Sequence, residues 1–177
     1  ITNNIAVSAG GGIFLNGGVD LQSTTIDQNE VTKTDGEGGG VYLQNGTLTM
    51  TGGSVIKGNK AALGGGVYAA GAGIDGGVID SNTATDSGGG IYMGTDMGSS
   101  FARVAITNNS ATNKGGGLVV SSYGKSSDAE VVGNTANIGG GIYMSGEGGF
   151  LSMDMASVFS NSATTGGGLH LDAGIVE

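Results

Sequence analysis

Gly10-Gly11-Gly12-Ile13 opens a pattern of three glycines and one apolar residue that returns six more times in the 177 residues. Successive first glycines are 24 to 28 residues apart. A regular period of this size predicts a solenoid, in which each repeat buries its apolar face only by stacking on the next. The later triplets begin at Gly38, Gly64, Gly88, Gly115, Gly139 and Gly166.

A second motif precedes each glycine triplet: Ile or Val, two variable residues, and Asn, as in Ile79-Asp80-Ser81-Asn82. Side-chain amides at one place in every turn can hydrogen-bond to the turns above and below. Asn also tolerates the left-handed conformation of a sharp corner. We therefore expect a structural Asn ladder. Its members are Asn4, Asn29, Asn59, Asn82, Asn109, Asn134 and Asn161.

The three residues after each triplet alternate, as in Ile91-Tyr92-Met93. A period of two predicts a strand whose first and third residues are buried and whose middle residue faces outward. If this alternation of inward and outward residues extends back into the triplet, the second glycine faces inward and the third faces outward. The middle residues are Phe14, Tyr42, Tyr68, Tyr92, Val119, Tyr143 and His170.

A third short strand is expected in each turn, after a segment of variable length. The strands expected are 19–21, 47–50, 101–106 and 150–155, and the loops are 16–18, 44–46, 94–100, 121–128 and 146–149. Three short strands per turn, without a helical stretch, indicate an all-β parallel β-helix of about seven turns. Residues 1–177 then form one segment, which we expect to be part of a longer repeat protein.

Composition argues against several classes of function. The net charge is −9 with a single arginine, Arg103, and such a surface repels nucleic acid and anionic lipid. No apolar run approaches the roughly 20 residues needed to cross a bilayer, so no direct membrane insertion is expected. Cysteine is absent, there is one histidine, and the carboxylates fall at unlike places in their turns. We therefore expect no metal, no cofactor and no catalytic residues.

Two surface features each have two possible interpretations from the sequence. The glycine triplets are best explained as tight corners with positive φ, although outward third glycines would also form a flat strip that a sugar could approach. The aromatic middle residues of these strands form a row, and stabilisation of the sheet is enough to explain it. The apolar faces and polar tips of this aromatic row would also suit binding to a glycan or a protein. The candidate binding residues are Phe14, Tyr42, Tyr68, Tyr92, Tyr143 and His170.

Ile79-Asp80-Ser81-Asn82-Thr83-Ala84, followed by Gly88-Gly89-Gly90-Ile91-Tyr92, resembles the polymorphic outer membrane protein repeats. The hallmarks of that family are Phe-x-x-Asn and Gly-Gly-Ala with a following aliphatic residue. Here Ile or Val replaces Phe and Gly replaces Ala. The resemblance covers essentially the whole chain and implies a right-handed parallel β-helix displayed outside the cell, with an adhesive or scaffolding role.

Three functions follow as expectations. The first is a non-enzymatic segment of an extracellular surface protein, a rigid stalk or adhesin whose partner is a host or neighbouring-cell glycan or protein. The second is a fibre subunit that stacks end to end on copies of itself. The third is a polysaccharide-degrading enzyme, which the scattered carboxylates and scarce basic residues disfavour.

Overall fold

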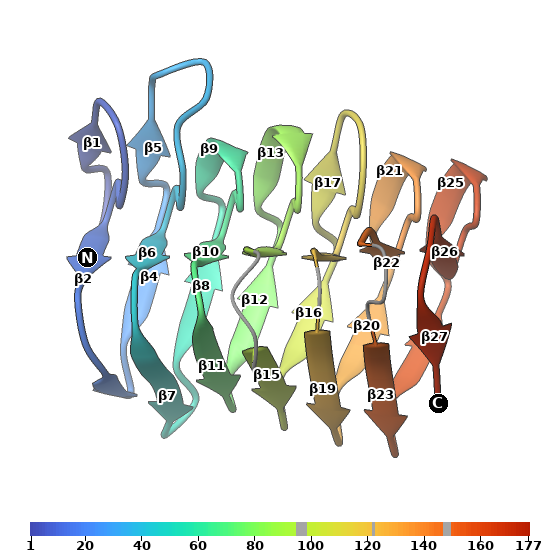
Figure 1. Cartoon of the computed structure of the whole chain (residues 1–177). Helices are drawn as coiled ribbons and strands as arrows, with labels where there is room; N and C mark the ends of the chain where they lie inside the picture. The colour runs from blue at the N-terminus through green and yellow to red at the C-terminus, as the bar shows by residue number, and fades with distance from the viewer. Residues whose placement is uncertain (95–98, 122, 147–149) are drawn as a thin grey trace.

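The computed structural model describes residues 1–94, 99–121, 123–146 and 150–177. Its strands, β1 to β27, wind in turns of four, and equivalent strands of successive turns stack in parallel (Figure 1). The first turn lies at one end of the resulting rod and the last turn at the other. The described residues form no helix of the length and hydrophobicity needed to span a bilayer.

Four parallel sheets run along the rod, three of seven strands and one of six. Sheet 1 contains β1 (Ile5–Ala6), β5 (Glu30–Val31), β9 (Lys60–Leu63), β13 (Thr83–Ser87), β17 (Ser110–Ala111), β21 (Thr135–Ile138) and β25 (Ser162–Thr165). Sheet 2 contains β2 (Ile13–Leu15), β6 (Val41–Leu43), β10 (Val67–Ala69), β14 (Ile91–Met93), β18 (Leu118–Val120), β22 (Ile142–Met144) and β26 (Leu169–Leu171).

The other two sheets complete each turn. Sheet 3 contains β3 (Val19–Gln22), β7 (Gly46–Thr51), β11 (Ala72–Asp75), β15 (Ser99–Ala102), β19 (Tyr123–Ser127), β23 (Phe150–Asp154) and β27 (Ile175–Val176). Sheet 4 contains β4 (Thr25–Asp27), β8 (Val55–Lys57), β12 (Val78–Asp80), β16 (Ala105–Thr107), β20 (Glu130–Val132) and β24 (Ser157–Phe159).

The core is a stack of aliphatic layers, one layer per turn. In sheet 2, the first and third residues of each middle-turn strand are fully buried, as Ile91 and Met93 are. The apolar residue of the Asn motif, such as Ile79 in sheet 4, lies in the same core. The inward first and third positions predicted for this strand are therefore confirmed in the middle turns, although the middle residues Val119 and Tyr143 are buried as well. Register is constant, with Val67 beside Ile91 and Ile91 beside Leu118, so every layer covers the next.

The all-β parallel solenoid expected from the repeats is confirmed, but a complete turn contains four strands where three were expected. The extra strand belongs to sheet 1 and lies between the Asn and the glycine triplet, as Lys60–Leu63 does. Its inward residue is small, as Ala84 and Ala111 are, and these alanines form a separate small buried cluster with Ala136. Short runs of small residues give a weak strand signal, because they bury little apolar area.

Two boundaries in sheets 3 and 4 also differ from expectation. Residues 101–106 are not one strand, because the chain turns at Arg103, whose φ is 49°, between β15 and β16. The expected loop 121–128 contains strand β19, in which Gly124 and Ser126 point inward. An alternation of small or polar inward residues lacks the apolar signal of a strand. Of the expected loops, residues 95–98, 122 and 147–149 lie outside the described residues.

The first glycine of each triplet forms the corner between sheets 1 and 2. All seven first glycines have φ between 61° and 70°, in the left-handed region. A Cβ at Gly88 would also lie 2.6 Å from the carbonyl oxygen of Ile91. Glycine is therefore required here both for its conformation and for the close approach of the chain.

The third glycine of the triplet faces inward, so the expected outward strip is wrong. A Cβ on Gly90 would lie 2.7 Å from the carbonyl oxygen of Gly117 and 2.9 Å from Nδ2 of Asn109. The chain bends at the second and third glycines, immediately before the strand, so the alternation of the strand does not extend back into the triplet. The third glycines of the middle turns are buried beneath the Asn ladder and offer no surface to a ligand.

Candidate functional site

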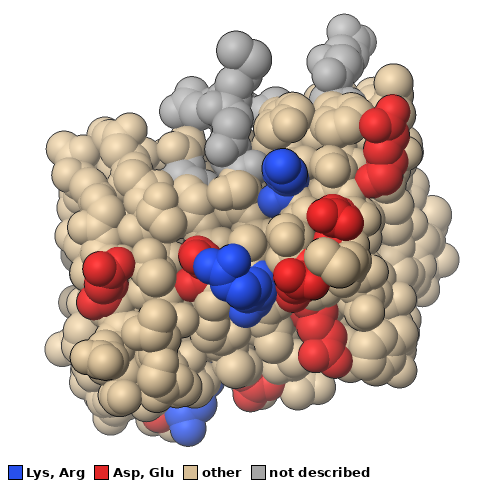
Figure 2. Space-filling model, turned by 90° about the horizontal axis from the view of Figure 1, so that it is seen from below, with Lys and Arg blue, Asp and Glu red and all other residues tan. Residues whose placement is uncertain are grey.

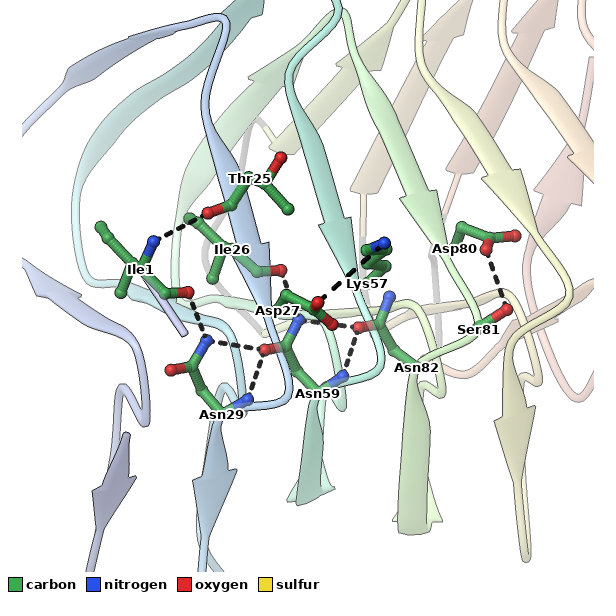
Figure 3. A network of polar contacts seen from close by, with 10 residues as sticks. All are labelled: Ile1, Thr25, Ile26, Asp27, Asn29, Lys57, Asn59, Asp80, Ser81 and Asn82. Carbon is green, nitrogen blue, oxygen red and sulfur yellow. Dashed lines mark hydrogen bonds and ion pairs between the residues drawn. The ribbon is translucent and has the colours of Figure 1, made fainter. Parts of the chain in front are cut away.

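The seven motif asparagines form one ladder at the corner between sheets 4 and 1. Figure 3 shows three of them, Asn29, Asn59 and Asn82. Asn59 Nδ2 donates to Asn82 Oδ1 at 3.0 Å and to the Ile26 carbonyl at 3.1 Å. The same Asn82 oxygen accepts the backbone N–H of Asn59 at 2.9 Å. Asn82 repeats this arrangement with Asn109, and each interior member thus uses both amide hydrogens and its oxygen.

The left-handed corner falls on the residue before each ladder asparagine, not on the asparagine itself as expected. Ser81, for example, has a φ of 54°. The ladder asparagine must align its backbone N–H and its side chain with the next turn, so the preceding, mostly exposed residue takes the unusual torsion. The residues concerned are Asn3, Gln28, Gly58, Ser81, Asn108, Gly133 and Ser160.

The aromatic row lies on the outer face of sheet 2, where its rings stack from turn to turn. The ring centroids of Phe14 and Tyr42 are 4.8 Å apart, those of Tyr42 and Tyr68 are 5.4 Å apart, and those of Tyr68 and Tyr92 are 5.2 Å apart. The interplanar angles are 11° or less. Parallel strand register brings equivalent side chains together at about 4.8 Å per turn, which is close to a stacking distance.

The row is less exposed than the sequence analysis expected. Phe14 is 56% exposed and Tyr42, Tyr68 and Tyr92 are half-buried, but Tyr143 is only 2% exposed. Because neighbouring rings cover one another's faces, the stack presents mainly ring edges and hydroxyl groups to solvent. A ligand can therefore reach a ring face only where the stack ends or is interrupted.

Tyr143 is held in a polar cluster that sequence analysis did not find. Its hydroxyl donates to Asp172 and accepts a hydrogen bond from Lys114 Nζ at 2.8 Å, and Lys114 Nζ lies 4.5 Å from the ring centroid. His170 stacks on Tyr143 at 5.6 Å, and its Nε2 is 3.1 Å from Asp172 Oδ1. Asp172 follows β26 directly and lies two residues after His170, a spacing that can place two side chains on one face. The spacing of His170 and Asp172 was the one feature of the sequence that could have indicated part of this cluster.

The hydroxyls of Tyr68 and Tyr143 stay protonated at neutral pH. Burial raises the pKa of Tyr143, and its hydrogen bond to Asp172 raises it further against the opposing effect of Lys114. The hydrogen bond to Tyr143 in turn raises the pKa of Lys114. Burial, followed by the charge of Glu37, raises the pKa of Tyr68. Hydrogen bonding to Tyr143 lowers the pKa of Asp172. The cluster therefore pairs the neutral phenol of Tyr143 with the charged ammonium of Lys114 and the charged carboxylate of Asp172.

Charge on the rod is sparse and mixed in sign. Figure 2 shows one face on which the few Lys and Arg side chains lie beside Asp and Glu and most of the surface carries no charge. Ion pairs join Lys60 to Glu30 at 2.9 Å and Arg103 to Asp75, both between adjacent turns. This face offers no continuous basic surface to a phosphate backbone. Among the described residues, no three His, Asp or Glu side chains gather where a metal could bind.

A family model described as right-handed beta helix region matches residues 1–174. The match includes strands β1 to β26, and therefore both the Asn ladder and the aromatic row. Searches among curated proteins and among solved structures gave no match.

Proposed function

The chain belongs to the right-handed β-helix family, and from this premise we propose that it is a non-catalytic segment of an extracellular surface protein, acting as a rigid stalk or adhesin. The fold alone does not decide function, because sites are built on folds and not specified by them. The resemblance to polymorphic outer membrane protein repeats supports a location at the cell surface and an adhesive or scaffolding role.

The unbroken Asn ladder is the observation that carries this proposal. Six steps of paired amide hydrogen bonds join Asn4 to Asn161 along the rod, and the four steps from Asn29 to Asn134 are buried. A fully satisfied buried network fixes one arrangement, because any displacement of one turn leaves buried polar groups without partners. Such a rod is suited to holding a binding surface at a constant distance from its point of attachment.

The Tyr143 cluster is the one described group that brings an amine, a phenol, a carboxylate and an imidazole together, and its geometry favours a structural role. A phenol that acts as a general base needs a pKa near the working pH. The pKa of Tyr143 is raised, its hydroxyl is already engaged on two sides by Lys114 and Asp172, and its ring is almost inaccessible.

The test is adhesion without turnover. Beads coated with the chain should bind a panel of glycans, matrix proteins or cell surfaces, and the bound glycans should be recovered unchanged in length. Cleavage of a polysaccharide that disappears in Tyr143→Phe would contradict the proposal and support a degrading enzyme instead.

End-to-end assembly is the second candidate. Large apolar side chains are exposed mainly in the first and last turns, where Ile5, Val7, Phe159 and Ile175 are at least half exposed. A further turn would cover them, whether it came from the same chain or from another copy. Sedimentation over a wide concentration range tests this candidate: filaments support it, and monomers at high concentration contradict it.

A further inference from the structure

The aromatic stack is interrupted at one turn, where Val119 takes the place of a ring. Val119 pairs in register with Tyr92 on one side and with Tyr143 on the other. Two steps of about 4.8 Å place those two rings about 10 Å apart. Since stacked rings of the row are 4.8 to 5.4 Å apart, the gap has the width of one additional ring.

A hollow of about 310 Å³ opens at this gap. Tyr92, Val119 and Tyr143 line it, and the polar side chains of Asp86, Asn113 and Lys114 line it as well. Lys114 belongs to the same turn as Val119, so its ammonium covers the face of Tyr143 that a ring at position 119 would have covered. The side of Tyr92 that faces Val119 carries no stacked ring and lines the hollow, and Val119, which is only 2% exposed, lies at its base.

The walls of the hollow are fixed before any ligand arrives. Tyr92 is stacked on Tyr68 at an interplanar angle of 4°. On the other wall, Tyr143 is held between His170, Lys114 and Asp172. A site whose side chains are already ordered loses little conformational entropy on binding.

The polar side chains offer both donors and acceptors. Asp86 Oδ1 accepts hydrogen bonds from Ser87 Oγ at 3.1 Å and from Asn113 Nδ2 at 3.2 Å. A carboxylate has about four acceptor positions, so Asp86 can also accept from a ligand hydroxyl. Lys114 has three N–H donors, of which one is directed at the Tyr143 hydroxyl.

We propose that the hollow binds one neutral hexopyranose ring of a glycan, with an apolar face of the sugar on Tyr92 and its hydroxyls on Asp86, Asn113 and Lys114. A pyranose combines apolar C–H faces with a rim of hydroxyls, which matches one free ring face beside a few convergent polar groups. A neutral sugar fits better than an acidic one, because Asp86 and Lys114 bring opposite charges to the hollow and the chain as a whole carries a net charge of −9. This inference rests on the proposed adhesive function.

The experiment is titration calorimetry with neutral hexaoses of glucose, mannose and galactose, and with hexagalacturonate as the acidic comparison. At least one neutral hexaose should bind more tightly than hexagalacturonate. Val119→Tyr, which places a ring in the gap, should weaken that binding at least tenfold. Asp86→Ala should weaken binding similarly. Because it changes an exposed side chain, it keeps the test valid if Val119→Tyr fails to fold. Tyr123→Ser, on sheet 3, is the matched control and should leave binding unchanged.

The outcomes separate the two proposals. If no neutral hexaose binds, or if Val119→Tyr and Asp86→Ala bind as the unaltered chain does, the hollow is not the site. If coated beads still adhere to cells or glycans in that case, the adhesive function remains and uses another surface. If they adhere to nothing, the adhesive function fails together with the hollow.

Discussion

Asn109 Nδ2 donates to Asn134 Oδ1 at 3.0 Å, and the same oxygen accepts the backbone N–H of Asn109 at 2.8 Å. One step up the ladder, the oxygen of Asn109 accepts two hydrogen bonds from Asn82. Asn109→Ala would leave two buried donors of Asn82 unpaired, and we expect it to lower the free energy of unfolding by about 3 kcal/mol or more. Urea denaturation followed by circular dichroism measures this change.

Asn4→Ala is the matched control for the ladder. Asn4 occupies the same motif position in the first turn, but its side chain is exposed. Water can replace its hydrogen bonds, so we expect a loss of less than about 1 kcal/mol. Equal losses in Asn4→Ala and Asn109→Ala would mean that burial of the amide network does not determine its contribution.

The third glycines give a second prediction. A Cβ on Gly90 would lie 2.7 Å from the carbonyl oxygen of Gly117 in the next turn, whereas a Cβ on Gly168, in the last turn, would have the Val158 side chain as its nearest contact at 3.6 Å. Overpacking a rigid interior typically costs about 1 to 3 kcal/mol. We therefore expect Gly90→Ala to destabilise the chain by about that amount and Gly168→Ala to be nearly neutral, as measured by thermal unfolding. Similar melting temperatures for both variants would contradict the inward placement of the third glycine.

The repeats predicted the fold because each turn meets the same physical demands. Ile91 and Met93 alternate with an outward Tyr92, and Asn82 recurs at one corner, so period and parity could be read directly. Strands such as Lys60–Leu63 and Tyr123–Ser127 were missed because small inward residues are recognised only through the neighbouring turns that they contact. The orientation of Gly90 was missed because a corner resets the alternation.

The candidate site could be predicted only in part. Position in the repeat was sufficient to place Tyr42, Tyr68 and Tyr92 in one row. It could not show that these rings cover one another's faces, nor that Lys114 and Asp172 enclose Tyr143. Those contacts depend on side-chain reach across turns, which residue spacing does not specify. The gap at Val119 was visible in the sequence, but its significance depends on which ring faces remain uncovered.

The lowered pKa of Asp80 predicts that the chain loses stability at low pH. Burial alone would raise the pKa of Asp80, but hydrogen bonds from Thr107, Asn108 and Ser81, together with the charge of Lys57, hold it below the usual value of 3.8. The folded chain then binds this proton less tightly than the unfolded chain. The stabilisation is therefore complete above about pH 4 and is lost as the pH falls through the folded-state pKa.

Asp80→Asn tests this dependence, because it removes the charge and keeps the shape. We expect the variant to be less stable than the unaltered chain at pH 7 and to approach it at pH values below the folded-state pKa of Asp80. Melting temperatures of both proteins across this range provide the measurement. A difference between them that is constant with pH would show that the charge of Asp80 is not responsible.

The raised pKa of Tyr68 predicts that the chain also loses stability at high pH. Burial, the nearby Glu37 carboxylate and the neighbouring tyrosines raise its pKa above the usual 10.0. Above about pH 10 the unfolded chain loses this proton while the folded chain retains it, so the free energy of unfolding falls as the pH rises further. Tyr68→Phe keeps the ring between Tyr42 and Tyr92 and removes the ionisable group. Urea denaturation at pH values on either side of 10 should therefore show a smaller alkaline loss in Tyr68→Phe than in the unaltered chain. Parallel losses would mean that the Tyr68 hydroxyl ionises equally readily in the stack and in the unfolded chain.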